Sequence, residues 1–366
     1  MGGVNTFLPT FGNRPDHIVG RDDVISDFLD GLSQPIGHPN RTSILIGQRG
    51  TGKTALLLEF ADLASQRDCV VARVTANRLM LNEIIQIIQI EGAKYAAERQ
   101  FPLKGLSAGA FGFSVGLTFT EETKKNYGFR VKLSLLCDEL AKQNKKVLIL
   151  VDEVQPNSEE MRDLATTYQH LIGEKKDIVI AMAGLPDSIS NVLNDNILTF
   201  LNRAHKVYLG PLPLGEISLY YAEVFTRFGK AIDSQALAAA VKATRGYPYL
   251  LQLMGYYLLG YSKGSDTISM TDVERATASS RQEMIDSVFN TVLKPLSTKD
   301  KEFLNALSKD GVTGRMSDIA QRMKVSQPYA QKYRRRLIAA GVISASSRGE
   351  VSLTIPYLGE YLRGDF

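Results

Sequence analysis

The chain has 366 residues, which predicts two or three domains, and its 44% hydrophobic and 22% charged residues are typical of a folded globular protein. The two cysteines, Cys69 and Cys137, are expected to be small core residues rather than a disulfide or a metal site, and the four scattered histidines indicate no metal cluster. No apolar stretch approaches the roughly 18 residues that a membrane-spanning helix needs, and the first residues carry no apolar secretory core. We therefore expect a cytoplasmic protein with no membrane partner.

The small net charge of +4 is unevenly distributed. Residues 297–366 contain 12 Lys and Arg against 7 Asp and Glu, an excess of +5, whereas the rest of the chain carries −1. Positive charge that is concentrated in one segment suits the phosphate backbone of nucleic acid. The C-terminal segment is therefore where we expect a nucleic-acid contact.

In residues 1–212, apolar strands alternate with helices. After an extended arm at 1–15 and a helix written VISDFLDGL, apolar runs predict strands at Ser43–Ile46, Cys69–Thr75, Lys146–Val151, Asp177–Ala183 and Lys206–Leu209. Apolar residues at helical spacing predict helices at Ala55–Ala64, Leu79–Arg99, Arg130–Gln143 and Met161–Gly173. Strands that alternate with helices pair in parallel, so this part predicts an α/β fold with helices on both faces of the sheet.

Small and apolar residues alternate between Leu106 and Thr120, with Phe111, Phe113 and Phe119 on the same face. A period of two residues predicts a strand or a β-ribbon. Two interpretations are open at this stage. The segment is either a hairpin that packs on the core, or an exposed apolar edge that binds a partner or a second subunit.

The strand pattern stops at Pro213. Helices are predicted at Leu214–Phe228, Ser234–Thr244, Tyr249–Gly260 and Met270–Leu293, and a break follows at Lys294–Ser297. The last segment predicts helices at Thr298–Ser308, Met316–Met323 and Gln327–Ala340, and then two short strands around Ser346–Gly349. We therefore expect an α/β domain at 1–212, an all-helical domain at 213–295 and a small third domain at 296–366.

The segment GQRGTGKT at Gly47–Thr54 fits the phosphate-loop pattern of a glycine, four residues and then Gly-Lys-Thr. A predicted strand precedes it and a predicted helix follows it, which is the context that this motif requires. Lys53 adds a positive charge for the phosphates, and the Thr54 hydroxyl is expected to bind Mg²⁺. The residues expected to surround the nucleotide phosphates are Gly47, Arg49, Gly50, Thr51, Gly52, Lys53, Thr54 and Ala55.

Two acidic residues, Asp152 and Glu153, end the apolar strand that begins at Lys146. Asp152 is placed to hold Mg²⁺, and Glu153 is placed to orient and deprotonate an attacking water. With the phosphate loop upstream, Glu153 and Lys53 are the candidate catalytic residues. This combination favours an ATPase that hydrolyses its nucleotide over a small-molecule kinase.

These motifs make the chain resemble the AAA+ superfamily of P-loop ATPases and its signalling neighbours, above all the archaeal-type ATPase family and archaeal replication initiators. IVGRD, from Ile18 to Asp22, resembles the N-terminal box that contacts adenine, and GQRGTGKT and ILVDE resemble Walker A and Walker B. Gly246-Tyr247-Pro248 resembles the Gly-x-Pro turn of the helical lid, and the last 70 residues resemble a winged helix.

The resemblance implies the parallel sheet of a P-loop NTPase, followed by an all-helical lid domain and a winged-helix domain. It also implies ATP or ADP with Mg²⁺ as cofactors, and a homo-oligomer that depends on nucleotide. It assigns adenine contacts to Val19, Gly20 and Arg21, and a nucleotide contact to Pro248.

The sequence departs from the family pattern at the residues that sense the γ-phosphate. The strand that carries the first sensor ends here in Ala181-Met182-Ala183-Gly184, with no polar side chain. Tyr249 takes the place of the second sensor, and Arg245 lies before the glycine instead. Arg203 stands where an arginine finger would lie, or is an ordinary surface arginine. We therefore expect slow hydrolysis.

The predicted helix QPYAQKYRRRLIAA presents polar and basic residues on the side away from its apolar face. Such a helix suits phosphates and guanine edges in the major groove of DNA, and the turn that follows adds another arginine. The alternatives are a protein-interaction module or a merely solvated face. The candidate DNA contacts are Gln327, Gln331, Lys332, Arg335, Arg336 and Arg348.

Three functions therefore stay open. The first is an ATP-hydrolysing switch of the AAA+ type that binds double-stranded DNA through its C-terminal domain. The second is a signalling ATPase that acts on a protein partner without DNA. The third is a scaffold that nucleotide stabilises and that does not hydrolyse it.

Overall fold

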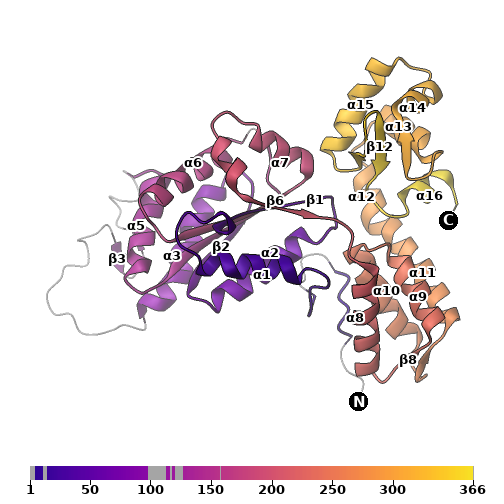
Figure 1. The fold of residues 1–366 in the computed structure, drawn as a ribbon, viewed down its shortest axis with the longest axis horizontal. Coiled ribbons are helices and arrows are strands. Elements are labelled where there is room, and N and C mark those ends of the chain that lie inside the picture. The colour runs from indigo at the N-terminus through magenta and orange to yellow at the C-terminus, as the bar shows by residue number, and fades with distance from the viewer. Residues whose placement is uncertain are drawn as a thin grey trace. The chain divides into compact units, whose positions relative to one another are not determined.

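The computed structural model describes residues 5–10, 15–97, 113–115, 118–119, 127–156 and 158–365. They form two compact units. The sheet unit contains Arg21–Gly47 and Lys53–Leu209, and the helical unit contains the described residues of 1–20, 48–52 and 210–366. Figure 1 shows the elements of each unit. Among the described residues, none of the helices has the length and apolar character needed to cross a membrane.

The sheet unit is built on five parallel strands in the order β2-β5-β6-β1-β7. Their bounds are β1 (Thr42–Gly47), β2 (Cys69–Thr75), β5 (Lys146–Asp152), β6 (Ile178–Gly184) and β7 (His205–Leu209). The parallel register is continuous, with Ile44 opposite Met182 and Val147 opposite Ile178. All five predicted strands are confirmed, and β6 separates the strand of the phosphate loop from the strand that ends in Asp152.

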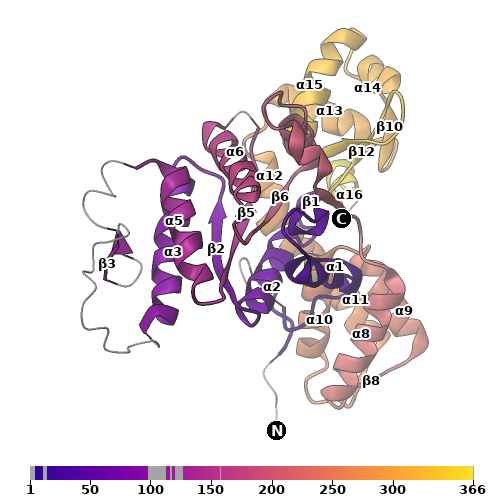
Figure 2. The ribbon, with the colours of Figure 1, turned by 60° about the vertical axis from the view of Figure 1, so that its left-hand side comes forward.

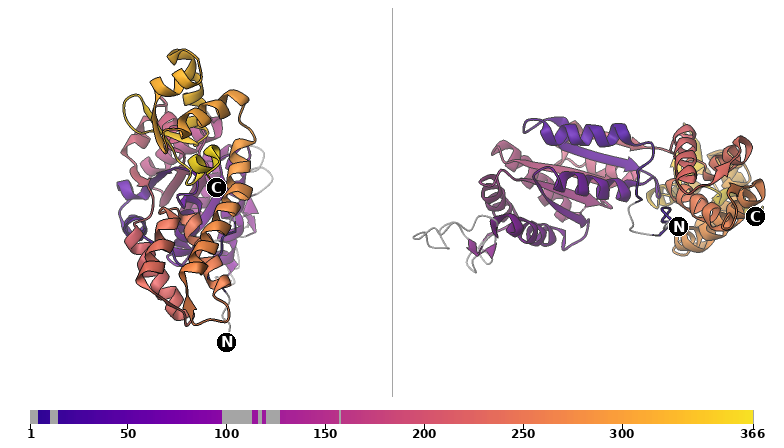
Figure 3. Two further views of the ribbon diagram at one scale, coloured as in Figure 1. Left: turned by 90° about the vertical axis from the view of Figure 1, so that its right-hand side faces the viewer. Right: turned by 90° about the horizontal axis from the view of Figure 1, so that it is seen from below.

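Helices cover both faces of this sheet, as Figure 3 shows and as the sequence predicts. On one face, Ile44 and its neighbours pack with α3 (Met80–Ala97), α5 (Phe129–Ala141), α6 (Glu159–Gly173) and α7 (Pro186–Leu193). Figure 2 shows α3 and α5 side by side on the sheet unit. The other face takes α2 (Lys53–Ser65) and, outside it, α1 (Asp22–Ser33), where Phe28 stacks on Phe60 at 3.8 Å between ring centroids. The two cysteines, Cys69 on β2 and Cys137 on α5, are free and buried.

The segment with two-residue alternation contains two short antiparallel strands, β3 (Phe113–Val115) and β4 (Thr118–Phe119). Phe113 pairs with Phe119, and the Phe119 side chain is buried in the same core as α3 and α5. The prediction of strand is confirmed for these residues, and Phe119 supports the interpretation as a hairpin on the core. The rest of 106–120 lies outside the described residues.

The helical unit begins with four helices that share one core. They are α8 (Leu214–Arg227), α9 (Ser234–Thr244), α10 (Pro248–Tyr261) and α11 (Met270–Glu283). The helix predicted as one piece from Met270 to Leu293 continues from α11 through a π-helical segment, η3 (Met284–Phe289), into α12 (Asn290–Leu293). Two short strands, β8 (Ala231–Ile232) and β9 (Thr267–Ile268), pair in parallel and were not predicted.

The C-terminal part of the helical unit places three helices against a small antiparallel sheet in the order β10-β12-β11. Along the chain the elements are α13 (Thr298–Ser308), β10 (Thr313–Arg315), α14 (Met316–Arg322), α15 (Gln327–Ala339), β11 (Ile343–Ala345), β12 (Glu350–Leu353) and α16 (Leu358–Arg363). Leu250 and Leu253 of α10 pack in the core of this part, so α10 belongs to two cores at once.

Candidate functional site

The phosphate loop joins β1 to α2, which begins at Lys53. Gly50 and Gly52 have φ angles of +74° and +90°, a region that residues with side chains rarely adopt. The Thr51 hydroxyl donates to the Gln48 carbonyl at 2.9 Å, and Lys53 Nζ donates to the Gly47 carbonyl at 2.8 Å. The backbone thus makes the tight turn that a phosphate loop needs, and the turn leads directly into the N-terminus of α2, where a helix favours negative charge.

Thr54 and Asp152, the two predicted Mg²⁺ ligands, lie together in the sheet unit. The Thr54 hydroxyl donates to Asp152 Oδ2 at 2.7 Å, and Asp152 Oδ1 accepts the N–H of Glu153 at 2.8 Å. Asp152 is only 7% exposed, at the carboxyl end of β5. Hydroxyl and carboxylate oxygens are the donors that Mg²⁺ prefers, so these residues fit the ion that the sequence predicts.

Glu153 follows Asp152 but points out of the sheet. Its φ of +54° is left-handed, and its side chain is exposed. Left-handed backbone is uncommon outside glycine and gathers at functional sites. The next residue returns to the sheet, because Val154 N–H donates to the Ala183 carbonyl of β6 at 2.9 Å. The turn therefore separates a buried carboxylate from an exposed one at adjacent positions.

At the end of β6, which lies between β1 and β5, no polar side chain is available. A Cβ built on Gly184 would lie 2.8 Å from Ile189 Cδ1 and 3.3 Å from Val154 Cβ. Apolar side chains therefore fill the place where the family pattern has its first sensor. The structure gives a packing reason for the departure seen in the sequence.

In the helical unit, Gly246-Tyr247-Pro248 forms the turn into α10. Gly246 has a φ of +70°, and a Cβ there would lie 2.6 Å from the Leu212 carbonyl oxygen, so glycine is required. Tyr247 Oη donates to the carbonyl of Arg49 in the phosphate loop at 2.9 Å. A Cβ on Gly50 would lie 1.9 Å from the same Oη. The sequence motif singled out Pro248, whose Cγ would lie 3.8 Å from a Cβ built on Gly52. It did not single out the contact of Tyr247, although an aromatic residue inside the turn motif was the available signal.

The N-terminal box is divided between the two units. Val19 is buried in the core of the helical unit, and a Cβ on Gly20, whose φ is +61°, would lie 3.1 Å from Pro213 Cδ. Arg21 begins the sheet unit, directly before α1, and burial lowers the pKa of its guanidinium. Because the Val19 side chain packs in the core, any ligand contact at Val19 and Gly20 comes from the backbone.

Arg203 is exposed at the end of a short 3₁₀ helix, η2 (Thr199–Arg203), just before β7. The first residue of β7, His205, pairs with Ser43 near the start of β1. The phosphate loop leaves β1 at its other end, Gly47. Arg203 therefore lies at the opposite edge of the sheet from the start of the loop, and the fold of the sheet unit does not bring the two together.

The candidate DNA contacts differ in their surroundings. Gln327, Lys332, Arg335 and Arg348 are exposed and Gln331 is half-buried, with Arg348 in the turn between β11 and β12, as predicted. Arg336, by contrast, forms a 2.8 Å ion pair with Asp300, a fully buried carboxylate in the first turn of α13. Arg336 thus has a structural role that the sequence does not indicate.

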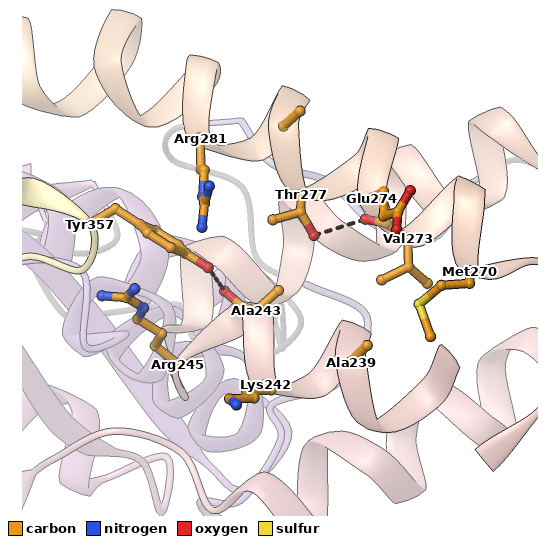
Figure 4. Close-up of a pocket in the computed structure, with 11 residues that line it drawn as sticks. Ala239, Lys242, Ala243, Arg245, Met270, Val273, Glu274, Thr277, Arg281 and Tyr357 are labelled. Atoms are coloured by element: carbon orange, nitrogen blue, oxygen red, sulfur yellow. Dashed lines mark hydrogen bonds between the residues drawn. The ribbon is translucent and has the colours of Figure 1, made fainter. Parts of the chain in front are cut away.

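A pocket of about 500 Å³ lies among α9, α11 and Tyr357, all within the helical unit (Figure 4). Figure 4 shows Arg245 and Arg281 on either side of the Tyr357 ring, and their guanidinium carbons lie 3.9 and 4.8 Å from its centroid. Tyr357 Oη donates to the Ala243 carbonyl at 2.6 Å, and Arg245 also pairs with Glu360 at 2.5 Å. Arg245 is therefore engaged in joining α9 to the residues around α16.

Two parts of the chain match models of known protein families. Residues 38–193, which include the phosphate loop and Asp152, match the family model described as an AAA domain. This region is therefore similar to an AAA domain. Residues 286–362 match a family described as a domain of unknown function (DUF8462). Among curated protein sequences, none matches the chain.

Solved structures match the chain along nearly its full length. The Walker-type ATPase PABY2304 of Pyrococcus abyssi is 16% identical, with 98% of this chain and 99% of that chain covered and a TM-score of 0.66. The ORC2 protein of Aeropyrum pernix, solved as ADPNP–ADP complexes, is 15% identical, with 97% and 94% covered and a TM-score of 0.61. At these identities the likeness shows the fold, which is that of a P-loop NTPase with a helical C-terminal region.

Proposed function

We propose that the chain is an ATP-binding and ATP-hydrolysing switch of the AAA type. The observation that carries this proposal is the 2.7 Å contact between the Thr54 hydroxyl and the buried Asp152 carboxylate. It joins the phosphate loop to the acidic strand end, as metal-dependent phosphoryl transfer requires. The ADPNP–ADP complexes of the similarly folded ORC2 protein support nucleotide as the ligand.

In this proposal the loop from Gly47 to Ala55 binds the phosphates through backbone N–H groups and the Lys53 ammonium. Thr54 and Asp152 would hold Mg²⁺, which when bound would neutralise charge on the phosphates. Glu153, exposed beside Asp152, orients the attacking water and accepts its proton. The backbone of Val19 and Gly20, together with Arg21 and Pro248, selects adenine.

We expect turnover to be slow. The place of a polar sensor at Gly184 is filled by Ile189 and Val154, and Arg245 is engaged by Tyr357 and Glu360. Fewer groups are therefore available to stabilise charge on the γ-phosphate in the transition state.

The nucleotide assignment is tested with Lys53→Ala. Loss of the ammonium removes a charge-assisted contact to the phosphates, so ATP affinity in isothermal titration calorimetry should fall at least about tenfold. Lys263→Ala, a change at an exposed lysine of the helical unit, is the matched control and should bind ATP like the wild type. Undiminished ATP affinity in a folded Lys53→Ala variant would contradict the assignment.

We further propose that residues 213–295 act as a lid domain and residues 296–366 as a winged helix that binds double-stranded DNA. The order helix, strand, helix, helix, strand, strand in the C-terminal part supports the winged helix. Lys332, Arg335 and Arg348 are exposed, and no ion pair engages them within the described part of the chain, so they suit the phosphate backbone.

DNA binding is tested by measuring duplex affinity over a range of salt concentrations. Lys332→Ala and Arg335→Ala should each weaken duplex binding. Each should also reduce the slope of log affinity against log salt concentration by about 1, because the loss of a phosphate contact lowers the number of counterions that binding releases. Lys263→Ala again serves as the control for a change of charge alone. Arg336→Ala is unsuitable, since it would leave the buried Asp300 unpaired. Binding that neither substitution changes would remove α15 as the DNA contact.

The apolar surroundings of Gly184 also favour a second candidate, a slow signalling switch that acts on a protein partner. It differs in its expected behaviour, since ATP turnover would be the same with and without duplex DNA. A scaffold that binds ATP with no turnover under either condition is the third outcome of that measurement.

A further inference from the structure

The described residues of the N-terminal arm, Asn5 to Thr10, include one fully buried side chain, Phe7. Its ring lies 5.8 Å from Tyr220 and 5.8 Å from Tyr221, both in edge-to-face geometry, and 6.2 Å from Phe225, measured between centroids. These three aromatic residues belong to α8, so the arm supplies part of the core of the four helices.

The slot for Phe7 is specific, because it depends on a glycine in the middle of α10. A Cβ on Gly255 would lie 2.3 Å from Phe7 Cε1, a distance at which the two carbon atoms would overlap. Glycine inside a helix is less favourable than alanine, and the close approach of the Phe7 ring explains its presence.

Polar contacts fix the arm along the same face of α10. Asn5 Nδ2 donates to the Tyr256 carbonyl at 3.3 Å, and Leu8 N–H donates to Gln252 Oε1 at 3.0 Å. Gln252, Gly255 and Tyr256 are three and four residues apart, which is the spacing of one helix face. The arm is therefore docked in one register.

Tyr220 links Phe7 to the N-terminal box. One of its neighbours is Phe7, and the His17 ring stacks on it at 5.8 Å with an interplanar angle of 30°. Val19, two residues beyond His17, is buried in the same core as Phe7. Gly20 then lies against Pro213, the residue before α8.

We propose that Phe7 is a positioning residue for adenine binding. By packing on Tyr220 it fixes residues 17–20 on α8, and so presents the Val19–Gly20 backbone in the geometry that the adenine ring needs. This inference rests on the proposed function, in which that backbone contacts adenine. Ordering of this backbone before ATP binds lowers the entropic cost of binding. Loss of that order should therefore weaken the binding of the adenine base and leave the binding of the phosphates unchanged.

The test compares ATP with inorganic tripolyphosphate, which lacks the base, by isothermal titration calorimetry. Gly255→Ala should push Phe7 out of its slot while favouring the helix of α10. Phe7→Ala with Gly255→Ala should preserve folding better than Phe7→Ala alone, since the new methyl group occupies part of the vacated slot. In Gly255→Ala and in the double variant, ATP affinity should fall about tenfold while tripolyphosphate affinity stays unchanged. In the same two variants, KM for ATP should rise with little change in kcat.

Two controls complete the experiment. Phe7→Leu keeps an apolar side chain in the slot and should restore most of the ATP affinity. Leu219→Ala changes a 69% exposed residue beside Tyr220 on α8 and should behave as the wild type. A wild-type ratio of ATP to tripolyphosphate affinity in the folded Gly255→Ala and double variants would overturn the positioning role alone. A wild-type protein that binds ATP no better than tripolyphosphate would overturn the adenine assignment, and the positioning role with it.

Discussion

Asp152 and Glu153 place two adjacent carboxylates in different surroundings. Asp152 continues the strand, is buried and bonds to Thr54, while the left-handed turn at Glu153 exposes the second carboxylate to water. A metal ligand needs a fixed and dry position, and a general base needs access to a water molecule. The backbone conformation of one residue therefore suits the two carboxylates to the two roles that we propose for them.

Glu153→Gln tests this separation at the residue scale. The amide keeps the size of the side chain but accepts a proton poorly, so ATP should bind with wild-type affinity while hydrolysis slows by about 100-fold or more. Phosphate release and calorimetry would measure the two effects. Glu159→Gln, in the first turn of α6, is the matched control. Hydrolysis at the wild-type rate in Glu153→Gln would exclude it as the base.

At the scale of elements, the contact between the end of β6 and α7 shapes the site. Gly184 ends the strand, and Ile189, one turn into α7, occupies the space where a side chain would lie. The glycine and the isoleucine are therefore a matched pair. The match holds α7 close to the end of β6 and excludes a polar group from the place between the two motif strands.

A double-mutant cycle measures this match. Gly184→Ala should destabilise the protein by about 1–3 kcal/mol through overpacking. Ile189→Ala should cost about 2–5 kcal/mol through loss of buried apolar contacts. Because the second change removes the atoms with which the first collides, the double variant should lose less than the sum of the two in urea denaturation. Strict additivity would show that the two residues do not share this space.

The elements that sequence patterns predicted are those with a strong local signal. Each strand of the parallel sheet has a run of apolar residues, and β6 is buried at every position, so its pattern could not be mistaken. The two-residue strands β8 and β9 carry too few residues for any period, and Thr313-Gly314-Arg315 in β10 has no apolar residue. The phosphate loop and the acidic strand end could be located from the sequence because each lies in a short motif. The burial of Phe7 was not, because it depends on Gly255, which is 248 positions further along the chain.

For the molecule as a whole, the position of Arg203 bears on assembly. It lies at the amino edge of the parallel strands, whereas the phosphate loop and Asp152 lie at the carboxyl edge. Within one sheet unit the two edges are separated by the length of the strands. If Arg203 serves as an arginine finger, it therefore serves the nucleotide of another copy of the chain.

Turnover measured against chain concentration tests this arrangement. ATP turnover per chain should rise with concentration in the wild type. In Arg203→Ala this increase should be at least about tenfold smaller, while ATP affinity stays unchanged. Arg227→Ala, at an exposed arginine on α8, controls for the lost charge. Activity per chain that is independent of concentration in the wild type, or the same rise in Arg203→Ala, would assign Arg203 to the surface.

The buried cysteines have a practical consequence for chemical labelling. Burial raises the pKa of the Cys69 thiol to about 11 and that of Cys137 to about 12, so at neutral pH almost no thiolate is present at either position. Since the thiolate is the nucleophile, maleimide dyes should react with neither native thiol. A cysteine introduced at exposed Tyr208 or Lys263 would then carry the dye alone, and fluorophores could be placed on either unit without first removing a native residue.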